Sequence, residues 1–242
     1  LLLASLKPDP RFFAHSSDEF GDRMMAATRR IEPRVGAYFL TTPKAPYGVL
    51  RLDPALEPSM TYGFYQLPSP DEPRGLYHFN GSNPRAKSTL MMAALIYHEL
   101  VPGHHFQMGI RNERTDLSPF RRRAQYTSYT EGWAEYASDL AGEMGMYADP
   151  YDRAGRLAMD LFLASRLVVD TGMNALGWTR ERAMQYMRDH TFEAGVQIET
   201  ETLRYSTDLP GQALAYKMGS LKIRELRTKA EAALGSAFDL RR

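Results

Sequence analysis

The 242-residue sequence contains no cysteine, which excludes disulfide bonds, thiolate metal sites and a cysteine nucleophile. It has no apolar run close to the roughly 20 residues that a membrane-spanning helix needs. An excess of charge of either sign is also missing, because 30 Lys and Arg stand against 29 Asp and Glu. Bulk charge therefore gives no reason to expect nucleic-acid binding. Any metal in this chain must be held by histidine and carboxylate groups.

The first third of the chain is rich in proline and aromatic residues and shows helical spacing only over residues 18–32. Two β-prone runs, 62–67 and 75–80, flank a proline-rich stretch and predict a strand pair bridged by a stiff loop. Asn83 and Pro84 then predict a helix start, with Asn83 as the N-cap. Beyond this point the apolar spacing predicts helices over residues 84–107, 128–144, 152–176, 179–190, 195–206 and 210–234.

These patterns predict one mainly α-helical domain over residues 1–242, with a small β element near its N-terminus. Residues 1–83 form the lead-in with the strand pair, and residues 84–242 form the helical core. The chain begins without methionine and ends directly after a helical pattern. We therefore expect it to be a fragment of a longer protein.

The strongest chemical signal is the segment Tyr97–Gln107, which reads YHELVPGHHFQ. A His-Glu pair in an apolar helix begins the signature H-E-x-x-H, in which both histidines bind zinc and the glutamate acts on the bound water. Here Pro102 occupies the position of the second histidine. The strict signature is therefore absent, and a replacement ligand must come from further along the chain.

A straight helix would not bring the other histidines to His98. His104 would lie about 120° around the helix and about 9 Å along it, and His105 about 10.5 Å along it. Neither could share a metal at the usual distance of about 2.1 Å. Pro102 and Gly103 predict a bulge or break, because proline cannot donate its backbone hydrogen bond and glycine allows unusual backbone paths. Such a break would bring His104 onto the face of His98.

A third ligand is expected from the helix over residues 128–144. Glu131 and Glu135 share one face of that helix, so either can reach the metal while the other supports the ligands from behind. The alternative is that the His-Glu pair is an ordinary surface or capping feature. Against that alternative, three histidines and a glutamate within eight residues would be costly to bury without a metal or hydrogen bonds.

The segment Tyr97–Gln107, together with the triplet Glu131-Gly132-Trp133, resembles the large bacterial family catalogued as domain of unknown function 885. Its members are regarded as zincin-like metallopeptidases and are often lipoproteins. Further agreeing stretches are residues 74–80, 168–172, 177–179 and 210–219. The resemblance covers nearly the whole chain and implies a zincin-like, gluzincin-type helical fold. Because family members are usually about twice as long, it also implies that this chain is a C-terminal half that contacts a missing N-terminal region.

The resemblance implies a Zn²⁺ site with three ligands, namely His98, His104 and Glu131. It implies that Glu99 is the general base. A local likeness to gluzincins of the dipeptidyl carboxypeptidase type instead implies Glu135 as the third ligand. His105 is then expected to support the ligands or to face the substrate.

The expected function is zinc-dependent hydrolysis of peptide bonds, in which Glu99 takes a proton from the activated water. Tyr216 is a candidate donor to the developing oxyanion, and Arg204 and Lys217 are candidate clamps for a substrate carboxylate. The segment Tyr77–Asn80 is a candidate edge strand that pairs with an extended peptide. For each of these groups an ordinary structural role is the alternative.

Two other functions remain open at this point. One is a metal-dependent amidase that acts on a modified amino acid or another small amide. The other is a non-catalytic helical binding domain with a degenerate site. No nucleic-acid partner and no transmembrane segment are expected. The resemblance implies a location in the bacterial cell envelope or outside the cell, with a cytoplasmic location as the alternative.

Overall fold

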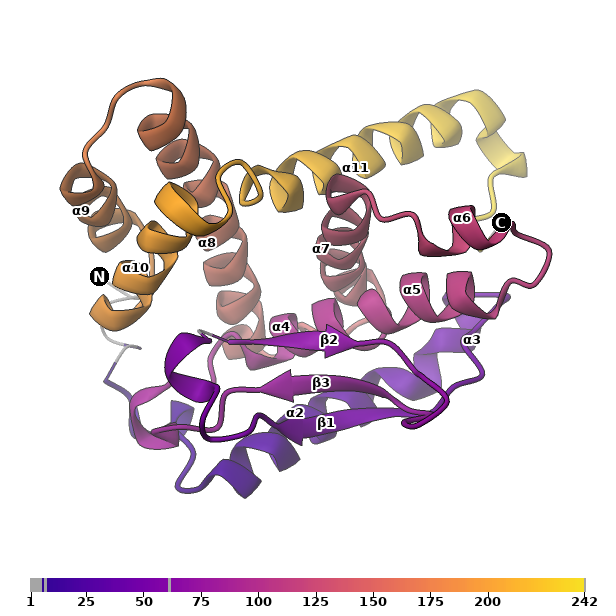
Figure 1. Cartoon of the computed structure of the whole chain (residues 1–242). Helices are drawn as coiled ribbons and strands as arrows, with labels where there is room; N and C mark the ends of the chain where they lie inside the picture. The colour runs from indigo at the N-terminus through magenta and orange to yellow at the C-terminus, as the bar shows by residue number, and fades with distance from the viewer. Residues whose placement is uncertain (1–5, 7, 61, 242) are drawn as a thin grey trace.

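The computed structural model describes residues 6, 8–60 and 62–241 and is mainly helical with one small sheet (Figure 1). Residues 1–5, which carry the expected cut end, lie outside the described part of the chain. The first helical elements are the 3₁₀ turn η1 (Pro10–Phe12), α2 (Ser17–Ile31), the 3₁₀ turn η2 (Glu32–Arg34) and α3 (Val35–Tyr38). The helix α2 confirms the helix predicted over residues 18–32.

The sheet has three strands in the order β1-β3-β2, formed by Tyr47–Arg51, Gly75–Phe79 and Gly63–Gln66 respectively. The predicted strand pair is confirmed as β2 and β3, which run antiparallel. The strand β1 was not predicted, and it pairs with β3 in parallel. Because β3 is the central strand, its backbone groups pair on both sides. The prediction that Tyr77–Asn80 is an edge strand open to a peptide is therefore wrong.

The helix predicted over residues 84–107 is wrong in its bounds. Pro84–Ala86 forms only the 3₁₀ turn η4, and the regular helix α4 begins at Met92 and ends at Glu99 (Met92–Glu99). Asn83 adopts a left-handed conformation (φ 45°) and its side chain caps nothing.

The remaining helices are α5 (His104–Glu113), α6 (Pro119–Arg123), α7 (Thr127–Glu143), α8 (Pro150–Ala175), α9 (Arg180–His190), α10 (Gly195–Leu203) and α11 (Leu214–Leu234). The last five of these, α7 to α11, match the other predicted ranges within a few residues. The helix α5 overlaps only the end of the range 84–107, and α6 was not predicted. Short turns complete the chain, namely the 3₁₀ turns η3 (Glu57–Ser59) and η6 (Gly235–Ala237) and the π-helical turn η5 (Arg204–Asp208). None of the helices in the described part of the chain is both long and apolar enough to cross a membrane.

The helix α4 is the centre of the fold, since every one of its residues is buried. It packs against α2 on the sheet side and against α7 and α8 on the other side, while α11 crosses α7 and α8 (Figure 1). A helix that is covered all round must be apolar on every face, and Met92–Tyr97 meets this need. His98 and Glu99 are the polar exceptions in α4, and both lie in its last turn.

The helices α7 and α11 approach each other closely where two glycines meet. A Cβ atom on Gly132 would lie 2.5 Å from the Cα atom of Gly219. We therefore expect Gly132→Ala to lower the free energy of unfolding by about 1–3 kcal/mol, because the two helices must separate. Urea denaturation measures this change. Gly36→Ala is the control, since its Cβ would meet no atom within 4 Å, and an equal loss of stability in both variants would contradict the prediction.

Candidate metal centre

A chain break directly after α4 brings two histidines together. The Leu100 amide closes α4 by donating to the Ile96 carbonyl (2.8 Å), and α5 begins four residues later. Within the break the Val101–Pro102 peptide bond is cis. Gly103 passes so close to α4 that a Cβ atom there would lie 1.7 Å from the His98 carbonyl oxygen. Only glycine fits this approach, which places the rings of His98 and His104 4.8 Å apart and nearly perpendicular.

Glu131 on α7 completes the cluster. Its Oε2 atom lies 3.3 Å from Nε2 of His98 and 3.3 Å from Nε2 of His104. Tetrahedral ligands at about 2.1 Å from one zinc ion stand about 3.4 Å apart, so the spacing fits a shared ion. In addition, Glu131 Oε2 is buried and has no hydrogen-bond partner among the described residues. The donor set and this unsatisfied oxygen both fit a bound cation.

Contacts between α7 and α4 hold Glu131 in place. The Trp133 indole Nε1 donates to the Pro102 carbonyl (3.1 Å), which ties α7 to the chain break. Two turns away, the Ser138 hydroxyl donates to the Ala94 carbonyl (2.8 Å) inside α4. The triplet Glu131-Gly132-Trp133 therefore has three structural tasks: the glutamate joins the histidines, the glycine admits α11 and the tryptophan fixes the break.

Glu135 lies behind His98 and not among the Nε2 donors. Its Oε2 atom is 3.5 Å from His98 Nδ1, a separation typical of an ion pair and long for a hydrogen bond. Its other oxygen accepts from Arg156 Nη2 at 2.5 Å, and both side chains are buried. The structure thus brings Glu131 to the two histidine Nε2 atoms, while Glu135 and Arg156 support His98 from behind.

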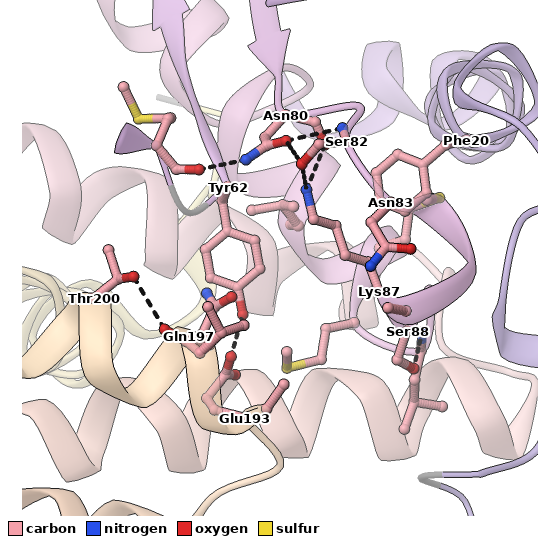
Figure 2. Close-up of a pocket in the computed structure, with 18 of the residues that line it drawn as sticks. Phe20, Tyr62, Asn80, Ser82, Asn83, Lys87, Ser88, Glu193, Gln197 and Thr200 are labelled. Carbon is pink, nitrogen blue, oxygen red and sulfur yellow. Dashed lines mark hydrogen bonds between the residues drawn. The ribbon is translucent and has the colours of Figure 1, made fainter. Parts of the chain in front are cut away.

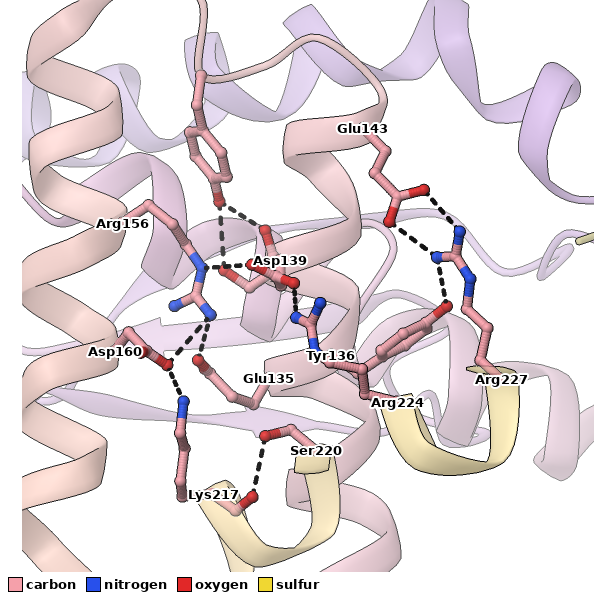
Figure 3. Close-up of polar contacts among 12 residues, drawn as sticks. Glu135, Tyr136, Asp139, Glu143, Arg156, Asp160, Lys217, Ser220, Arg224 and Arg227 are labelled. Carbon is pink, nitrogen blue, oxygen red and sulfur yellow. Dashed lines mark hydrogen bonds and ion pairs between the residues drawn. The ribbon is translucent and has the colours of Figure 1, made fainter. Parts of the chain in front are cut away.

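The Glu135–Arg156 pair opens a wider network between α7, α8 and α11 (Figure 3). Arg156 lies 3.8 Å from Asp160, which also binds Lys217. Further out, α7 and α11 are joined by the ion pairs Asp139–Arg224 and Glu143–Arg227. Sequence reasoning missed Arg156. The feature that could have revealed Arg156 is its place among Gly155, Ala158 and Met159 on the buried face of α8. Arginine rarely occurs on such a face without a partner.

The electrostatics of the cluster favour a positive charge between its carboxylates. Burial opposes protonation of His98, but the Glu131 and Glu135 carboxylates raise its pKa to about 10. Burial also opposes ionisation of Glu131, yet the charge of His104 holds the pKa of that carboxyl well below its usual range. The pKa of Glu99 is raised, because burial outweighs the two histidines. Carboxylates that favour a positive charge beside them in this way suit a cation held between the histidines and Glu131.

A cavity of about 740 Å³ reaches this cluster at His98. His98 and Glu99 line it, and so does Tyr216 from the first turn of α11. The Tyr216 ring lies 5.9 Å from the His98 ring and almost parallel to it, while the Gln212 amide donates to its hydroxyl (3.2 Å). Burial, followed by the charge of Glu131, raises the pKa of Tyr216, so its hydroxyl is protonated and can donate.

Comparison with known families agrees with this architecture. The model of the family described as "Bacterial protein of unknown function (DUF885)" matches residues 2–242. The chain belongs to this family. A crystal structure of a "putative lipoprotein" from Colwellia psychrerythraea shares 37% sequence identity with a TM-score of 0.93, covering 99% of this chain and 42% of that one.

A second solved structure, described as a "putative lipoprotein of unknown function", comes from Shewanella oneidensis. It matches with a TM-score of 0.79 and 19% identity over 99% of this chain and 44% of that one, and it shows the same fold. The DUF885 chain thus spans less than half the length of both solved structures. A search of curated proteins found no match.

A second cavity of about 610 Å³ adjoins the first in this DUF885 chain (Figure 2). The two share Tyr62, Leu95, Met159 and Thr200 among their lining residues. Its wall is mainly apolar. Asn80, a predicted substrate-binding residue, lines this second cavity, but its amide donates to the carbonyls of Glu57 (2.8 Å) and Met60 (2.5 Å). The side-chain amide of Asn80 therefore holds in place the loop that contains Glu57 and Met60.

The other predicted residues fall into two groups. Glu99, Tyr216 and Arg204 line the cavity of the metal centre. Tyr77 lies fully buried in the central strand, near enough to Glu99 for that charge, after burial, to raise its pKa. Lys217 is absent from the lining of both cavities and binds Asp160 on α8.

His105 turns away from the metal centre. It is fully buried, its Nδ1 atom lies 2.9 Å from the Tyr65 hydroxyl, and its Nε2 atom lies 3.1 Å from the Ala45 carbonyl. Burial lowers the pKa of His105 to about 4, so the ring is neutral and joins α5 to the sheet. Tyr65, which sequence reasoning missed, also stacks on His104 with ring centroids 6.3 Å apart.

Proposed function

We propose that this DUF885 chain is the zincin-like core of a zinc-dependent peptidase. The observation that carries the proposal is the meeting of His98 Nε2 and His104 Nε2 at one Glu131 oxygen, 3.3 Å from each. Two imidazoles and one carboxylate are the donor set of many catalytic zinc sites. Glu99 lines the same cavity directly beside this set.

The three donors would hold Zn²⁺, with Glu135 and Arg156 keeping His98 in its orientation. When bound, zinc would supply an activated water molecule and would polarise the carbonyl of the scissile bond. The protein must then contribute a base, an oxyanion donor and a wall that orients the substrate. Each of these has a candidate among the residues that line the cavity.

Glu99 would take the proton that the water loses as it attacks the carbonyl carbon. The same carboxyl group would deliver that proton to the amine nitrogen that leaves, so the proton balance closes without another acid. The Tyr216 hydroxyl, held by Gln212, would donate to the carbonyl oxygen as negative charge develops on it. The peptide bond breaks, and the free acid and the amine leave the cavity.

A location in the bacterial cell envelope belongs to the same proposal. It is supported by the lipoprotein descriptions of both similar solved structures. A peptidase in that location would meet peptides or small amides from the cell's surroundings.

Metal binding is the direct test. We expect the full natural protein to bind about one zinc ion per chain and to gain about 2.7 kcal/mol of unfolding free energy when free zinc is one hundred times its dissociation constant. His104→Ala should remove most of this gain, whereas His190→Ala should keep it, because His190 is exposed and bonds the Tyr186 carbonyl on its own helix α9. Mass spectrometry and urea denaturation measure both quantities. A folded protein with no zinc-dependent stabilisation would overturn the proposal.

A further inference from the structure

Three arginines line the cavity that reaches His98, and two of them have no acidic partner among the described residues. They come from different elements: Arg166 from α8, Arg180 from α9 and Arg204 from the π turn η5. Arg166 is buried and pairs with Glu201 at 2.7 Å. In the part of the chain that the structure describes, neither Arg180 nor Arg204 forms an ion pair.

The two unpaired guanidinium groups keep unused hydrogen-bond donors. Arg180 donates to the Thr202 hydroxyl (3.2 Å) and the Glu199 carbonyl (2.8 Å), and Arg204 donates to the Gln212 side-chain oxygen (3.2 Å). These partners are all neutral. A guanidinium group has five N–H donors, and each of these side chains is only half-buried, so several donors can face the cavity. This fork geometry matches a carboxylate.

Gln212 links Arg204 directly to the catalytic side of the cavity. Its side-chain oxygen accepts from Arg204, and its amide nitrogen donates to the Tyr216 hydroxyl. Tyr216 in turn stacks on His98. Arg204 is therefore two side chains away from the metal centre, which is a suitable separation for a group that holds one end of a bound peptide.

The segment that carries Arg204 is built rigidly. Arg204 opens the π-helical turn η5, in which the Leu209 amide donates to the Arg204 carbonyl (2.9 Å). The Gly211 amide then donates to the Asp170 carboxylate (3.0 Å), and Asp170 is only 1% exposed. Single π turns of this kind occur frequently at functional sites. The turn η5 and the segment that follows it thus hold Arg204 and Gln212 on a fixed backbone.

The side of the cavity that carries Arg180 and Arg204 is positively charged in its less exposed part. Among the carboxylates of the lining, Glu99 lies at the other end of the cavity beside His98, and Glu201 is neutralised by Arg166. The two others, Glu199 and Asp208, are exposed to solvent. Exposed carboxylates are screened by water, while half-buried guanidinium groups beside an apolar wall are screened less. An anionic substrate group would therefore be drawn to Arg180 and Arg204.

We propose that Arg204, together with Arg180, forms a subsite for a carboxylate of the peptide substrate. The inference rests on the proposed peptidase function. The carboxylate comes either from the C-terminus of the peptide, which would make the protein cut near that end, or from an acidic side chain. Lys217, bound to Asp160, takes no part in this subsite.

Equilibrium binding tests the subsite without relying on turnover. The full natural protein carrying Glu99→Gln is titrated calorimetrically with three ligands: an N-acetyl peptide with a free C-terminus, its C-terminal amide, and the amide with a glutamate side chain. We expect at least one carboxylate-bearing peptide to bind about ten- to a hundredfold more tightly than the neutral amide. Preference for the free C-terminus indicates the terminal carboxylate, and preference for the glutamate peptide indicates the side chain.

Arg204→Gln should remove the preference, and Arg204→Lys should retain part of it, since lysine keeps the charge but not the fork. Arg182→Gln is the matched control on α9, because its guanidinium lies 4.0 Å from the centre of the Trp178 ring and outside the cavity lining. Repeating the titrations in metal-free protein separates carboxylates that bind arginine from those that bind zinc. Equal affinity for all three peptides, or a preference unchanged by Arg204→Gln, overturns this subsite and leaves the zinc-binding result untouched.

Discussion

Glu99→Gln is expected to lower kcat for peptide hydrolysis by about a hundred- to ten-thousandfold, the usual contribution of general acid–base catalysis. Glutamine has the shape of glutamate but cannot accept the proton. Glu99 is the last residue of α4, lines the cavity of the metal centre and is 9% exposed. The substitution should therefore remove the base without disturbing the helix, and zinc content should stay at the wild-type level.

Steady-state kinetics and metal analysis on the same preparation check this expectation. Glu199→Gln is a matched control, because Glu199 lines the same cavity but is exposed to solvent. Its turnover should remain within a few-fold of wild type. If Glu99→Gln kept turnover of every peptide substrate within about tenfold of wild type, Glu99 would not be the base.

Arg156→Met is expected to lower the free energy of unfolding by about 3–5 kcal/mol. The substitution preserves most of the side-chain volume but removes the partner of Glu135, which is 1% exposed. A buried carboxylate without a partner must be desolvated or protonated, and both cost free energy. Urea denaturation in the presence of a chelator measures the loss without a contribution from zinc.

Two further variants separate the pair from its surroundings. Arg224→Met removes an ion pair with Asp139 on the same helix α7, but Arg224 is 55% exposed, so a loss of less than about 1 kcal/mol is expected. The double change Arg156→Met with Glu135→Leu should recover most of the stability, because no unpaired charge remains. Zinc affinity should nevertheless stay about 10–100-fold weaker, since His98 has lost its supporting carboxylate. A stable single variant would show that Glu135 is not held by Arg156.

Most of the helical part of the fold was predictable because the apolar spacing is local. The ranges expected for α2, α7, α8 and α9 agree with the structure within a few residues. The helix expected over residues 84–107 failed, because the sequence near Asn83 carries start signals that lead only to a 3₁₀ turn. The strand β1 was missed because it is held by parallel pairing with β3, and each partner residue in β3 lies 28 positions further along the chain.

The part of the candidate site that lies within one continuous segment of the chain could be predicted. Pro102 and Gly103 predict a break between His98 and His104, and the structure has one there with the two rings in contact. The choice between Glu131 and Glu135 was open, because both stand on one face of α7. The position of α7 on α4, fixed by contacts such as Ser138 with Ala94 and Trp133 with Pro102, places Glu131 and not Glu135 beside both histidine Nε2 atoms.

The sequence by itself determined the break in the helix and the family, and it limited the ligands that a metal could have. Without cysteine, only histidine and carboxylate ligands remain, and Gly103 is required where α5 turns back against α4. Tertiary structure alone decided which glutamate meets the histidines, that Arg156 pairs behind them, and that Arg180 and Arg204 face the same cavity. Glu131, Arg156, Arg180 and Arg204 lie 33 to 106 positions from His98, and local periodicity carries no information about which distant faces pack together.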